Sequence, residues 1–561
     1  MRDFPNRTGE TMEPNSKTKK SAQFQPNRRE FLKKSAGVAG ALTMASMAGE
    51  VGSLLLAPER GEAATERNHF VFGTLSERNT MDPHDAYTIV TYAFSLNLYD
   101  NLVRFAGNPP EVVPWLAESR AVSGDGLTWT FRLRRGVKFH DGRELTADDV
   151  VYSVDRLLRL GKDPASIFKP CLKAGAAEAP DRYTVRIKLY QSFAPFISIL
   201  PILSVVNKNL VQKNEKSGDL GAAWLNQSDA GSGAYKLRSY EPATGFVADR
   251  FPEYWRGWKG NHFESMEMRV IREASSQVLN LQKGLIHMTH ALLPPEQFQR
   301  MANMKGVRVS SDQTLRTFVI RMNNQRPPLN DVNVRKAISH AFDYEGFIKA
   351  VMQGDAFRNP VPIPVNMWGN PKNLPAYTFD LGKAESYLSK AKTKITRPLD
   401  LIALAGLPIP EQAALLLQSN LKKLGVEVKI RGLTFPQFAA AAGKQETMGD
   451  MATHWASSFY PDPDNWIGKM YDSRNWGSWQ ACNFYKNPEV DGLLQKAREV
   501  VDRAERQKLY EQATAIIFED AVDVWIYNSV TQRGLSDRLR GYSFCPIGDG
   551  LDFYPLYLTE A

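Results

Sequence analysis

Residues 453–466, THWASSFYPDPDNW, hold the group of side chains in this chain that is best suited to binding a small molecule. Four aromatic side chains stand among small polar residues, prolines and acids: Trp455, Phe459, Tyr460 and Trp466. Aromatic faces with a few polar groups are what a small-molecule pocket requires. Pro461 and Pro463 break regular structure, so the segment is predicted to be a loop. The alternative is an aromatic turn that covers a core, and the segment by itself leaves both interpretations open.

Residue patterns typical of enzymes are absent from the sequence. It contains no G-x-S-x-G, H-E-x-x-H, Walker or G-x-G-x-x-G motif. His287 and His290 are three residues apart and could share a helix face as metal ligands, but no third ligand follows at a useful spacing. The neighbouring pair His140-Asp141 is better explained as part of a turn. We therefore predict no catalytic residue, no metal ligand and no cofactor.

Length and charge limit the classes of protein that the chain can belong to. Its 561 residues are too many for one core, so two or three domains are expected. The formal charge is +9, of which +3 lies in residues 1–64, and no dense basic block with interleaved aromatics follows. Nucleic acid is therefore not an expected partner. Cys171, Cys482 and Cys545 lie far apart, so at most one disulfide could form and no metal spacing is present.

The first 64 residues are predicted to be an export leader. Residues 27–34, NRREFLKK, precede a weakly apolar run of Ala, Gly and Met over residues 36–49, an arrangement that resembles a twin-arginine signal. An amphipathic basic helix is the alternative, and two small-x-small sites leave the cleavage point open. No later run reaches the roughly 18 apolar residues of a membrane span. We expect the mature protein to be soluble and outside the cytoplasm.

Periodic patterns along the remaining chain predict a mixture of helices and strands. Residues 127–133 alternate as in a half-buried strand, and Thr146 with Asp149 predicts a capping box at the start of a helix. The glycines of residues 231–235 precede a strand instead of a helix, which favours a tight crossing over a phosphate cradle. Helices are also predicted over residues 87–103, 330–342, 380–388, 412–424 and 502–517, and strands over residues 70–75, 183–189, 426–430 and 522–527. This mixture indicates an α/β class.

Taken together, these segments resemble the extracytoplasmic solute-binding proteins of family 5, the oligopeptide/dipeptide/nickel-binding group that serves ABC importers. The resemblance covers essentially all of residues 68–561. Its segments follow in the family's order: LTWTFRLRRGVKFHDGRELTADDVVYSVDRLL at 127–158, GSGAYKLRSYEPATGFVADRFPEYW at 231–255, LNDVNVRKAISHAFDYEGFIKAVMQGDA at 329–356, FDLGKAESYLSKA at 379–391, LLQSNLKKLGVEVKI at 416–430, and the loop at 455–462.

The resemblance implies a type II-like periplasmic binding protein, with two lobes around a ligand cleft and an extra domain in lobe I. The implied boundaries are residues 68–110, 231–314 and 525–561 for lobe I, 111–230 for the extra domain and 315–524 for lobe II. Such a protein captures a small solute by closing its lobes and delivers it to permease subunits of the inner membrane. A monomer is expected. An exported enzyme or a chemosensory protein on the same fold is the alternative.

The loop departs from the family where peptide-binding members carry an Asp that pairs with the peptide's amino group. Depending on the alignment, that position falls on Ser458 or Phe459, and neither is acidic. A peptide is thus one option and a sugar or an opine-like compound another. The predicted ligand-binding residues are Trp455, Ser457, Ser458, Phe459, Tyr460 and Tyr87. Trp476 and Trp479 are assigned either to ligand stacking or to packing.

Overall fold

The computed structural model describes residues 68–75, 77, 80–85, 89–457, 459–547 and 551–560. The predicted leader, Tyr87 and Ser458 lie outside these residues. No helix within the described ranges is both long and apolar enough to cross a membrane.

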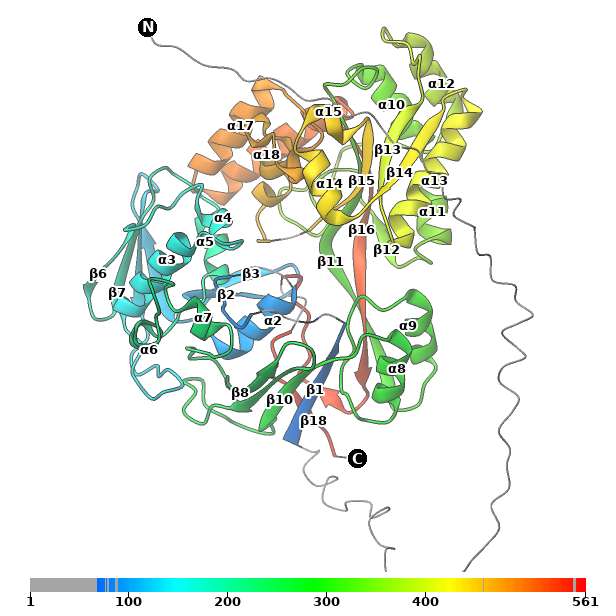
Figure 1. Cartoon of the computed structure of the whole chain (residues 1–561). Helices are drawn as coiled ribbons and strands as arrows, with labels where there is room; N and C mark the ends of the chain where they lie inside the picture. The colour runs from blue at the N-terminus through cyan, green and yellow to red at the C-terminus, as the bar shows by residue number, and fades with distance from the viewer. Residues whose placement is uncertain are drawn as a thin grey trace, which may run out of the picture. The chain divides into compact units, whose positions relative to one another are not determined.

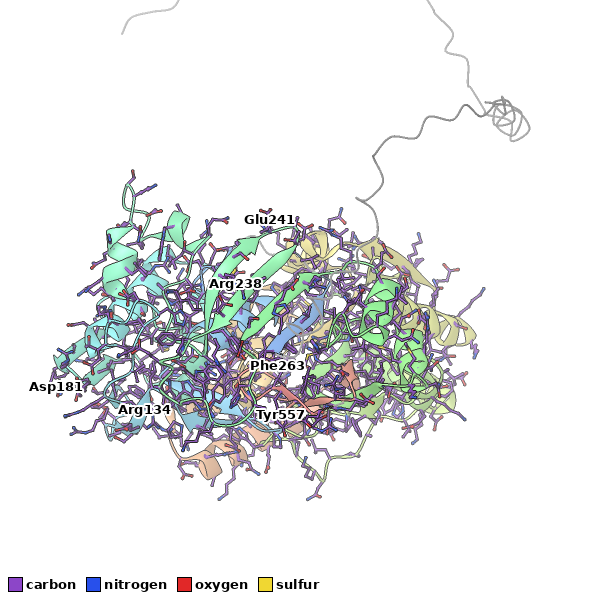
Figure 2. All side chains as sticks on the ribbon, turned by 90° about the horizontal axis from the view of Figure 1, so that it is seen from below. Arg134, Asp181, Arg238, Glu241, Phe263 and Tyr557 are labelled. Carbon is purple, nitrogen blue, oxygen red and sulfur yellow. The ribbon has the colours of Figure 1, made fainter. Side chains whose placement is uncertain are left out.

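A four-stranded sheet gathers strands from the start and the middle of the chain. Its order is β1 (His69–Thr74), β10 (Ser265–Val270), β9 (Gly245–Arg250) and β8 (Tyr235–Glu241), with β1 and β10 parallel and the other pairs antiparallel. The strand predicted at 70–75 is β1. The edge strand β8 carries charged side chains, among them Arg238 and Glu241, which Figure 2 labels on this strand. Charges on an edge strand discourage pairing with a second sheet.

The core of this sheet, the β1-sheet core, explains the glycines at 231–235. It combines side chains of β1, β9 and β10 with those of α2 (Ile89–Leu98), a helix that ends five residues before the predicted end. A Cβ atom on Gly231 would lie 1.8 Å from the Leu98 carbonyl oxygen, and one on Gly233 would lie 2.5 Å from the Asn97 oxygen. Only glycine allows this approach of two backbones. The segment is a tight crossing over the end of α2, and the strand β8 follows it as predicted.

A second sheet forms a core of its own, called the small-sheet core, from residues between Leu102 and Val205. Its order is β4 (Ala117–Val122), β5 (Thr128–Leu133), β7 (Thr184–Lys188) and β6 (Ala177–Asp181), and its main helix is α3 (Ala147–Leu160). The alternation predicted at 127–133 is confirmed, because every second side chain of β5 is buried. The capping box is also present, and the Thr146 N–H donates to the Asp149 carboxylate at 3.0 Å.

The third sheet has six strands in the order β12 (Ala356–Arg358), β16 (Asp523–Ser536), β11 (Val307–Met322), β15 (Met451–Ala456), β13 (Leu399–Leu404) and β14 (Val428–Leu433). Strand β13 runs parallel to both β14 and β15. A large cluster, the six-strand core, packs this sheet against helices. These include α10 (Val332–Ala341), α12 (Leu381–Lys390), α13 (Pro408–Lys423), α17 (Pro488–Glu499) and α18 (Arg503–Glu519).

The helix starts around this sheet follow from their caps. Asp380 accepts from the Lys383 N–H at 2.9 Å at the start of α12, and Asp502 accepts from Glu505 at 2.8 Å at the start of α18. Gly425 takes the predicted left-handed conformation after α13, with φ +74°. The predicted start of α13 at 412 is four residues late. Proline is tolerated in the first turn of a helix, where its missing N–H has no partner to lose.

Two long strands, β11 and β16, lie side by side and connect the cores (Figure 1). The early part of β11, through Val307 and Val309, packs beside β1, whereas its later part, from Leu315 to Met322, belongs to the six-strand core. The pairing of β11 with β16 shifts register between Gln313 and Thr317. Bulges of this kind bend a strand pair and increase its twist. The domain boundaries that the resemblance implies stay a prediction.

Candidate functional site

Three parallel strands of the six-stranded sheet end at the same edge and direct their loops to one place. These loops follow β13 at residues 405–407, β14 at Thr434, and β15 at residues 457 and 459–460. In open α/β sheets, ligands bind in the crevice outside the carboxyl ends of the strands. Two large apolar side chains at this edge are open to solvent, Leu407 with 42% and Phe435 with 49% of their surface exposed. This edge is therefore the candidate binding surface of the sheet.

Trp455 is the second-last residue of strand β15 and is not part of the loop. The loop prediction is right for residues 457 and 459–462, whereas residues 453–456 belong to β15. The Trp455 indole N–H donates to the Tyr527 hydroxyl at 3.3 Å, and its ring lies 5.0 Å from the Phe318 ring. Trp455 is partly exposed. It can therefore form a wall of a site while it packs on β11 and β16.

The two aromatic residues of the loop pack on the small-sheet core, although the strand before them, β15, belongs to the six-stranded sheet. Tyr460 is only 1% exposed and belongs to the small-sheet core, and Phe459 packs against that core while it stays partly exposed. Burial raises the pKa of Tyr460 well above its usual value, and its hydroxyl donates to Asp464 Oδ2 at 3.0 Å. The loop thus bridges two cores, with Tyr460 as its support and Phe459 as the ring that remains accessible.

Asn465, which sequence reasoning missed, holds the backbone of this loop. Its carbonyl oxygen accepts from the Phe459 N–H at 3.1 Å, and its amide donates to the Ser457 carbonyl at 3.0 Å. The side chain is fully buried. One amide therefore fixes the loop at Ser457 and at Phe459. A signal was present in the sequence, because Asn after Pro-Asp is typical of a turn that closes on its own backbone.

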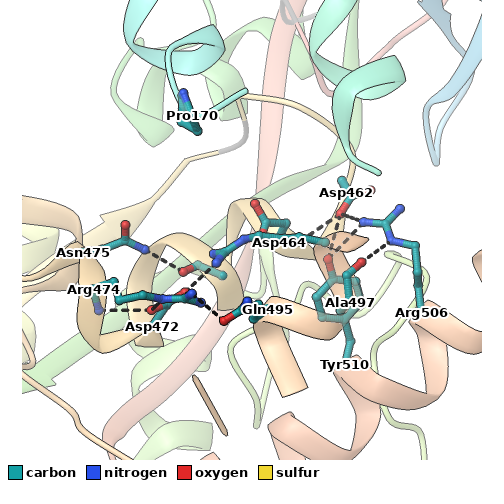
Figure 3. Close-up of polar contacts among 12 residues, drawn as sticks. Pro170, Asp462, Asp464, Asp472, Arg474, Asn475, Gln495, Ala497, Arg506 and Tyr510 are labelled. Atoms are coloured by element: carbon teal, nitrogen blue, oxygen red, sulfur yellow. Dashed lines mark hydrogen bonds and ion pairs between the residues drawn. The ribbon is translucent and has the colours of Figure 1, made fainter. Parts of the chain in front are cut away.

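The acids of the loop are bound to arginines and do not face an open site. Asp462 accepts from Arg506 at 2.8 Å and from the Tyr510 hydroxyl at 3.4 Å, as Figure 3 shows. Burial raises the pKa of Asp462, while Arg506 acts in the opposite direction. Asp462 also caps the short helix η3 (Pro463–Asn465), since it accepts from the Asp464 N–H at 3.0 Å. Asp462 therefore holds the turn together through its own contacts.

A second arginine joins two further carboxylates behind the loop. Arg498 donates to Asp464 Oδ1 at 2.7 Å and to Asp472 Oδ2 at 2.5 Å, and Arg474 binds Asp472 in a bidentate pair (Figure 3). Burial disfavours the charge on Arg498, but Asp464 and Asp472 outweigh it and raise its pKa. Hydrogen bonds between two charged groups are among the stronger ones in proteins.

Lys469 is the residue of this region that sequence reasoning missed entirely. It lies on α16 (Ile467–Tyr471), and its ammonium stands 5.4 Å from the Phe459 ring centre and 5.3 Å from that of Tyr460. It makes no hydrogen bond and no ion pair within 4.0 Å to any residue that the structure describes. Burial lowers the pKa of Lys469 to about 8, Asp464 raises it in part, and Arg498 lowers it further.

The other candidates from the sequence take structural places. The Trp476 indole N–H donates to the Tyr485 carbonyl at 3.0 Å, and Trp479 packs 5.3 Å from Phe435 and 5.1 Å from His454. Trp476 therefore packs under the sheet edge, whereas Trp479 extends the apolar surface of Phe435.

The histidines also have structural partners. His140 pairs with Asp229 at 2.8 Å and not with Asp141. His287 accepts from the Val71 N–H at 3.0 Å, and burial lowers its pKa to about 4. No group of three metal-ligating side chains occurs within the described ranges.

Comparisons with known proteins identify the class. The sequence profile of the bacterial extracellular solute-binding proteins, family 5 Middle, matches residues 111–478. A probable D,D-dipeptide-binding periplasmic protein of Escherichia coli (strain K12) is 32% identical over 492 residues, covering 86% of this chain and 93% of its own. Heme-binding protein A of Haemophilus influenzae is 28% identical over 511 residues, with 86% and 91% covered.

A solved structure has the same fold. It is an ABC transporter-associated periplasmic binding protein of Helicobacter pylori in complex with the peptide STSA, with a TM-score of 0.73, 26% identity, and 89% of this chain and 100% of the other covered. The two-lobed, type II α/β fold expected from the sequence is thereby confirmed. The chain belongs to the bacterial extracellular solute-binding proteins of family 5. It is the substrate-binding component of an ABC importer.

Proposed function

We propose that the chain captures its solute between the carboxyl edge of the six-stranded sheet and the small-sheet core, and that Trp455, Ser457, Ser458, Phe459 and Tyr87 line the site. The observation that carries this proposal is the bridging loop. Phe459 and Tyr460 follow a strand of one core and pack on another. A solute held by this loop contacts both sides at once, and Tyr460 supports Phe459 from beneath.

Closure of the two sides around the solute would use β11 and β16 as its hinge. One of their register shifts, between Gln313 and Thr317, lies where β11 passes from one core to the next, and bulges of this kind allow a strand pair to bend. The contacts that join the two sides include two hydrogen bonds to the end of α17. The Ala194 N–H donates to the Arg498 carbonyl at 2.7 Å, and the Ser192 hydroxyl donates to the Glu499 carbonyl at 3.0 Å. The boundaries at 110, 230, 314 and 524 describe the bodies that would move.

The ligand class is a small peptide-like solute, or another polar solute that stacks on an aromatic ring. Relatives are named for D,D-dipeptide and heme binding. A buried ammonium group of a ligand needs an acidic partner. The acids nearest the loop, Asp462 and Asp464, are already paired with Arg506 and Arg498. A free α-amino group is therefore not required for binding.

A thermal-shift panel tests this function. It contains D-alanyl-D-alanine, L-alanyl-L-alanine, their N-acetyl forms, octopine and glucose, each added to the purified mature chain. A solute that binds only the folded protein raises the melting temperature. We expect a shift with at least one member, and an N-acetyl form that works as well as its free amine. A strict requirement for the free amine would contradict the proposed ligand class.

The placement of the site is tested by substitution. Phe459→Ala and Trp455→Ala should each weaken the binding of the active panel member, whereas Phe379→Ala, an exposed phenylalanine before α12, should not. Unchanged affinity in both of the first two variants would show that the solute binds elsewhere. Recovery of the solute unchanged after incubation is expected of a binding protein, and its conversion would indicate an enzyme.

The proposal has two further parts. The chain is exported to the periplasm by the twin-arginine route, and it acts there as a monomer that binds no nucleic acid. Arg28 and Arg29 followed by an apolar run support the route, and the absence of a dense basic block supports the partner assignment. Replacement of both arginines by lysine should leave the precursor in the cytoplasm. Native mass spectrometry of the exported chain should report one copy, together with any solute that co-purifies.

A further inference from the structure

The corner of the loop around Lys469 carries a charge that the protein does not neutralise. Three arginines balance three aspartates in this region: Arg474, Arg498 and Arg506 with Asp462, Asp464 and Asp472. Lys469 is the additional cation. Both oxygens of the nearest carboxylate, Asp464, are occupied, one by Arg498 and one by the Tyr460 hydroxyl. The ammonium of Lys469 forms no hydrogen bond or ion pair with the part of the chain that the structure describes.

The position of this ammonium connects it to the proposed site. Its neighbours are the rings of Phe459 and Tyr460, and Phe459 is the accessible ring of the bridging loop. Lys469 is itself partly exposed and extends from a five-residue helix directly after the Pro-Asp-Asn turn. A solute that stacks on Phe459 thus comes close to a cation with three free donor hydrogens.

We propose that Lys469 is a ligand-binding residue that anchors an anionic group, a carboxylate above all, of a solute stacked on Phe459. This inference rests on the proposed function and deepens it. The site would bind an anionic group of the ligand through a lysine, instead of binding the ligand's amino group through an acid. The solute is an acid whose anionic end lies at the loop.

Physical reasons favour a ligand role over a purely structural one. A partly buried ammonium that forms no ion pair within 4.0 Å lowers the stability of the ligand-free protein. The charge has lost solvent, and Asp464, the carboxylate that acts on it, is already bonded to Arg498. Contacts with two rings return only part of this loss. A carboxylate from the solute would supply the missing partner in a charge-assisted hydrogen bond, which is among the stronger contacts available.

Isothermal titration with a matched pair of probes tests the inference on the purified mature chain. The probes are N-acetyl-D-alanyl-D-alanine and its C-terminal amide, which differ only in the charge of the carboxyl group and lack an ammonium. We expect the wild-type chain to bind the acid about tenfold or more tightly than the amide, as for a hydrogen bond to a charged group. Lys469→Met should abolish this preference, and Lys469→Arg should retain most of it.

A structural tether and an anion anchor give different results in the same titrations. If Lys469 only held the loop through the two rings, Lys469→Met would weaken the acid and the amide by the same factor. Lys486→Met, in an exposed loop position of the same region, is the control for loss of a positive charge and should change neither affinity.

The outcomes separate this inference from the proposed function. Equal affinities of the wild-type chain for acid and amide, or a preference that survives in Lys469→Met, would overturn the anion anchor and leave the proposed site standing. Failure of every panel member, including the acid, to bind or to raise the melting temperature would contradict both.

Discussion

The loop after β15 has two sides that treat charge in opposite ways. On one side, Asp462 with Arg506 and Asp464 with Arg498 form buried ion pairs. On the other side, the ammonium of Lys469 lies 5.4 Å from the ring centre of the partly exposed Phe459 and forms no ion pair with any residue that the structure describes. Paired charges fix the shape of the loop. Lys469 and the partly exposed ring of Phe459 are the groups that we assign to the solute.

This comparison shows that acidic residues in a loop sequence do not by themselves indicate a site for a cationic ligand. The segment PDPDNW is rich in acids, and the structure uses both aspartates to hold α17 and α18. The charge left for ligand binding is positive. A charged residue that is buried in a pair with another residue of the protein is not available to bind a ligand.

The largest effect is expected from breaking one of the buried ion pairs of the loop. Arg506→Met leaves the buried Asp462 carboxylate without its cation, and should lower the free energy of unfolding by about 3–5 kcal/mol. Chemical denaturation followed by tryptophan fluorescence measures it. Arg503→Met is the matched control, because its pair with Glu111 is exposed and should be worth no more than about 1 kcal/mol. Equal losses in the two variants would contradict the structural role of the Asp462–Arg506 pair.

Substitutions of the adjacent residues Tyr460 and Phe459 should have different effects, one on stability and the other on ligand binding. Tyr460→Ala removes a ring from the small-sheet core and should cost about 3–5 kcal/mol of folding free energy, by analogy with other buried aromatic truncations. Circular dichroism during thermal and chemical unfolding provides the readout. A variant as stable as the wild type would show that the loop does not depend on this anchor.

Phe459→Ala should instead reduce affinity, by about tenfold for the active panel member, with little loss of stability. The ring is partly exposed, so its removal opens no buried cavity of comparable size. Titration calorimetry and the unfolding curves of the same preparation give both numbers. Loss of stability with unchanged affinity would assign Phe459 to packing and remove it from the site.

A further effect concerns pH. In the ligand-free chain the pKa of Lys469 is about 8, below its usual 10.5, so the unfolded state binds more protons between these values. The stability contributed at this position therefore rises as pH increases from about 8 to about 10.5, because a costly charge is lost. The wild-type chain should gain stability relative to Lys469→Met over this range in denaturation experiments. A constant difference would mean that the ammonium is as well solvated as in the unfolded chain.

Bound acid should act in the opposite direction. Asp464 is already occupied by Arg498 and Tyr460, so a carboxylate from the solute becomes the main acidic partner of Lys469 and raises its pKa again. Affinity for N-acetyl-D-alanyl-D-alanine should consequently fall as the pH rises above about 8. The amide should show no such fall.

Local patterns in the sequence predicted much of the fold. The alternation at 127–133, the capping box of Thr146 and Asp149, the helix start at Asp380 and the left-handed Gly425 all depend on neighbours within a few residues. The start of α13 was missed because Pro408 and Pro410 look like breaks, although a helix tolerates proline in its first turn.

The site was only partly predictable, because its properties arise from contacts far apart in the chain. The loop itself was found from its composition and from the resemblance to the family. The burial of Tyr460 could not be seen, since its core is built by residues between Leu102 and Val205. The importance of Lys469 depends on Arg498 occupying Asp464, a contact between residues 34 positions apart. No periodicity or motif records such a pairing.

The crystal structure of the chain with the solute that co-purifies with it tests the central claim most directly. The distance to measure is from Lys469 Nζ to the nearest anionic atom of the solute. The account predicts hydrogen-bond distance, about 3 Å, with the solute against the Phe459 ring and the Asp462–Arg506 and Asp464–Arg498 pairs intact. A solute whose anionic group binds elsewhere, or whose ammonium is held by Asp462 or Asp464, would contradict it.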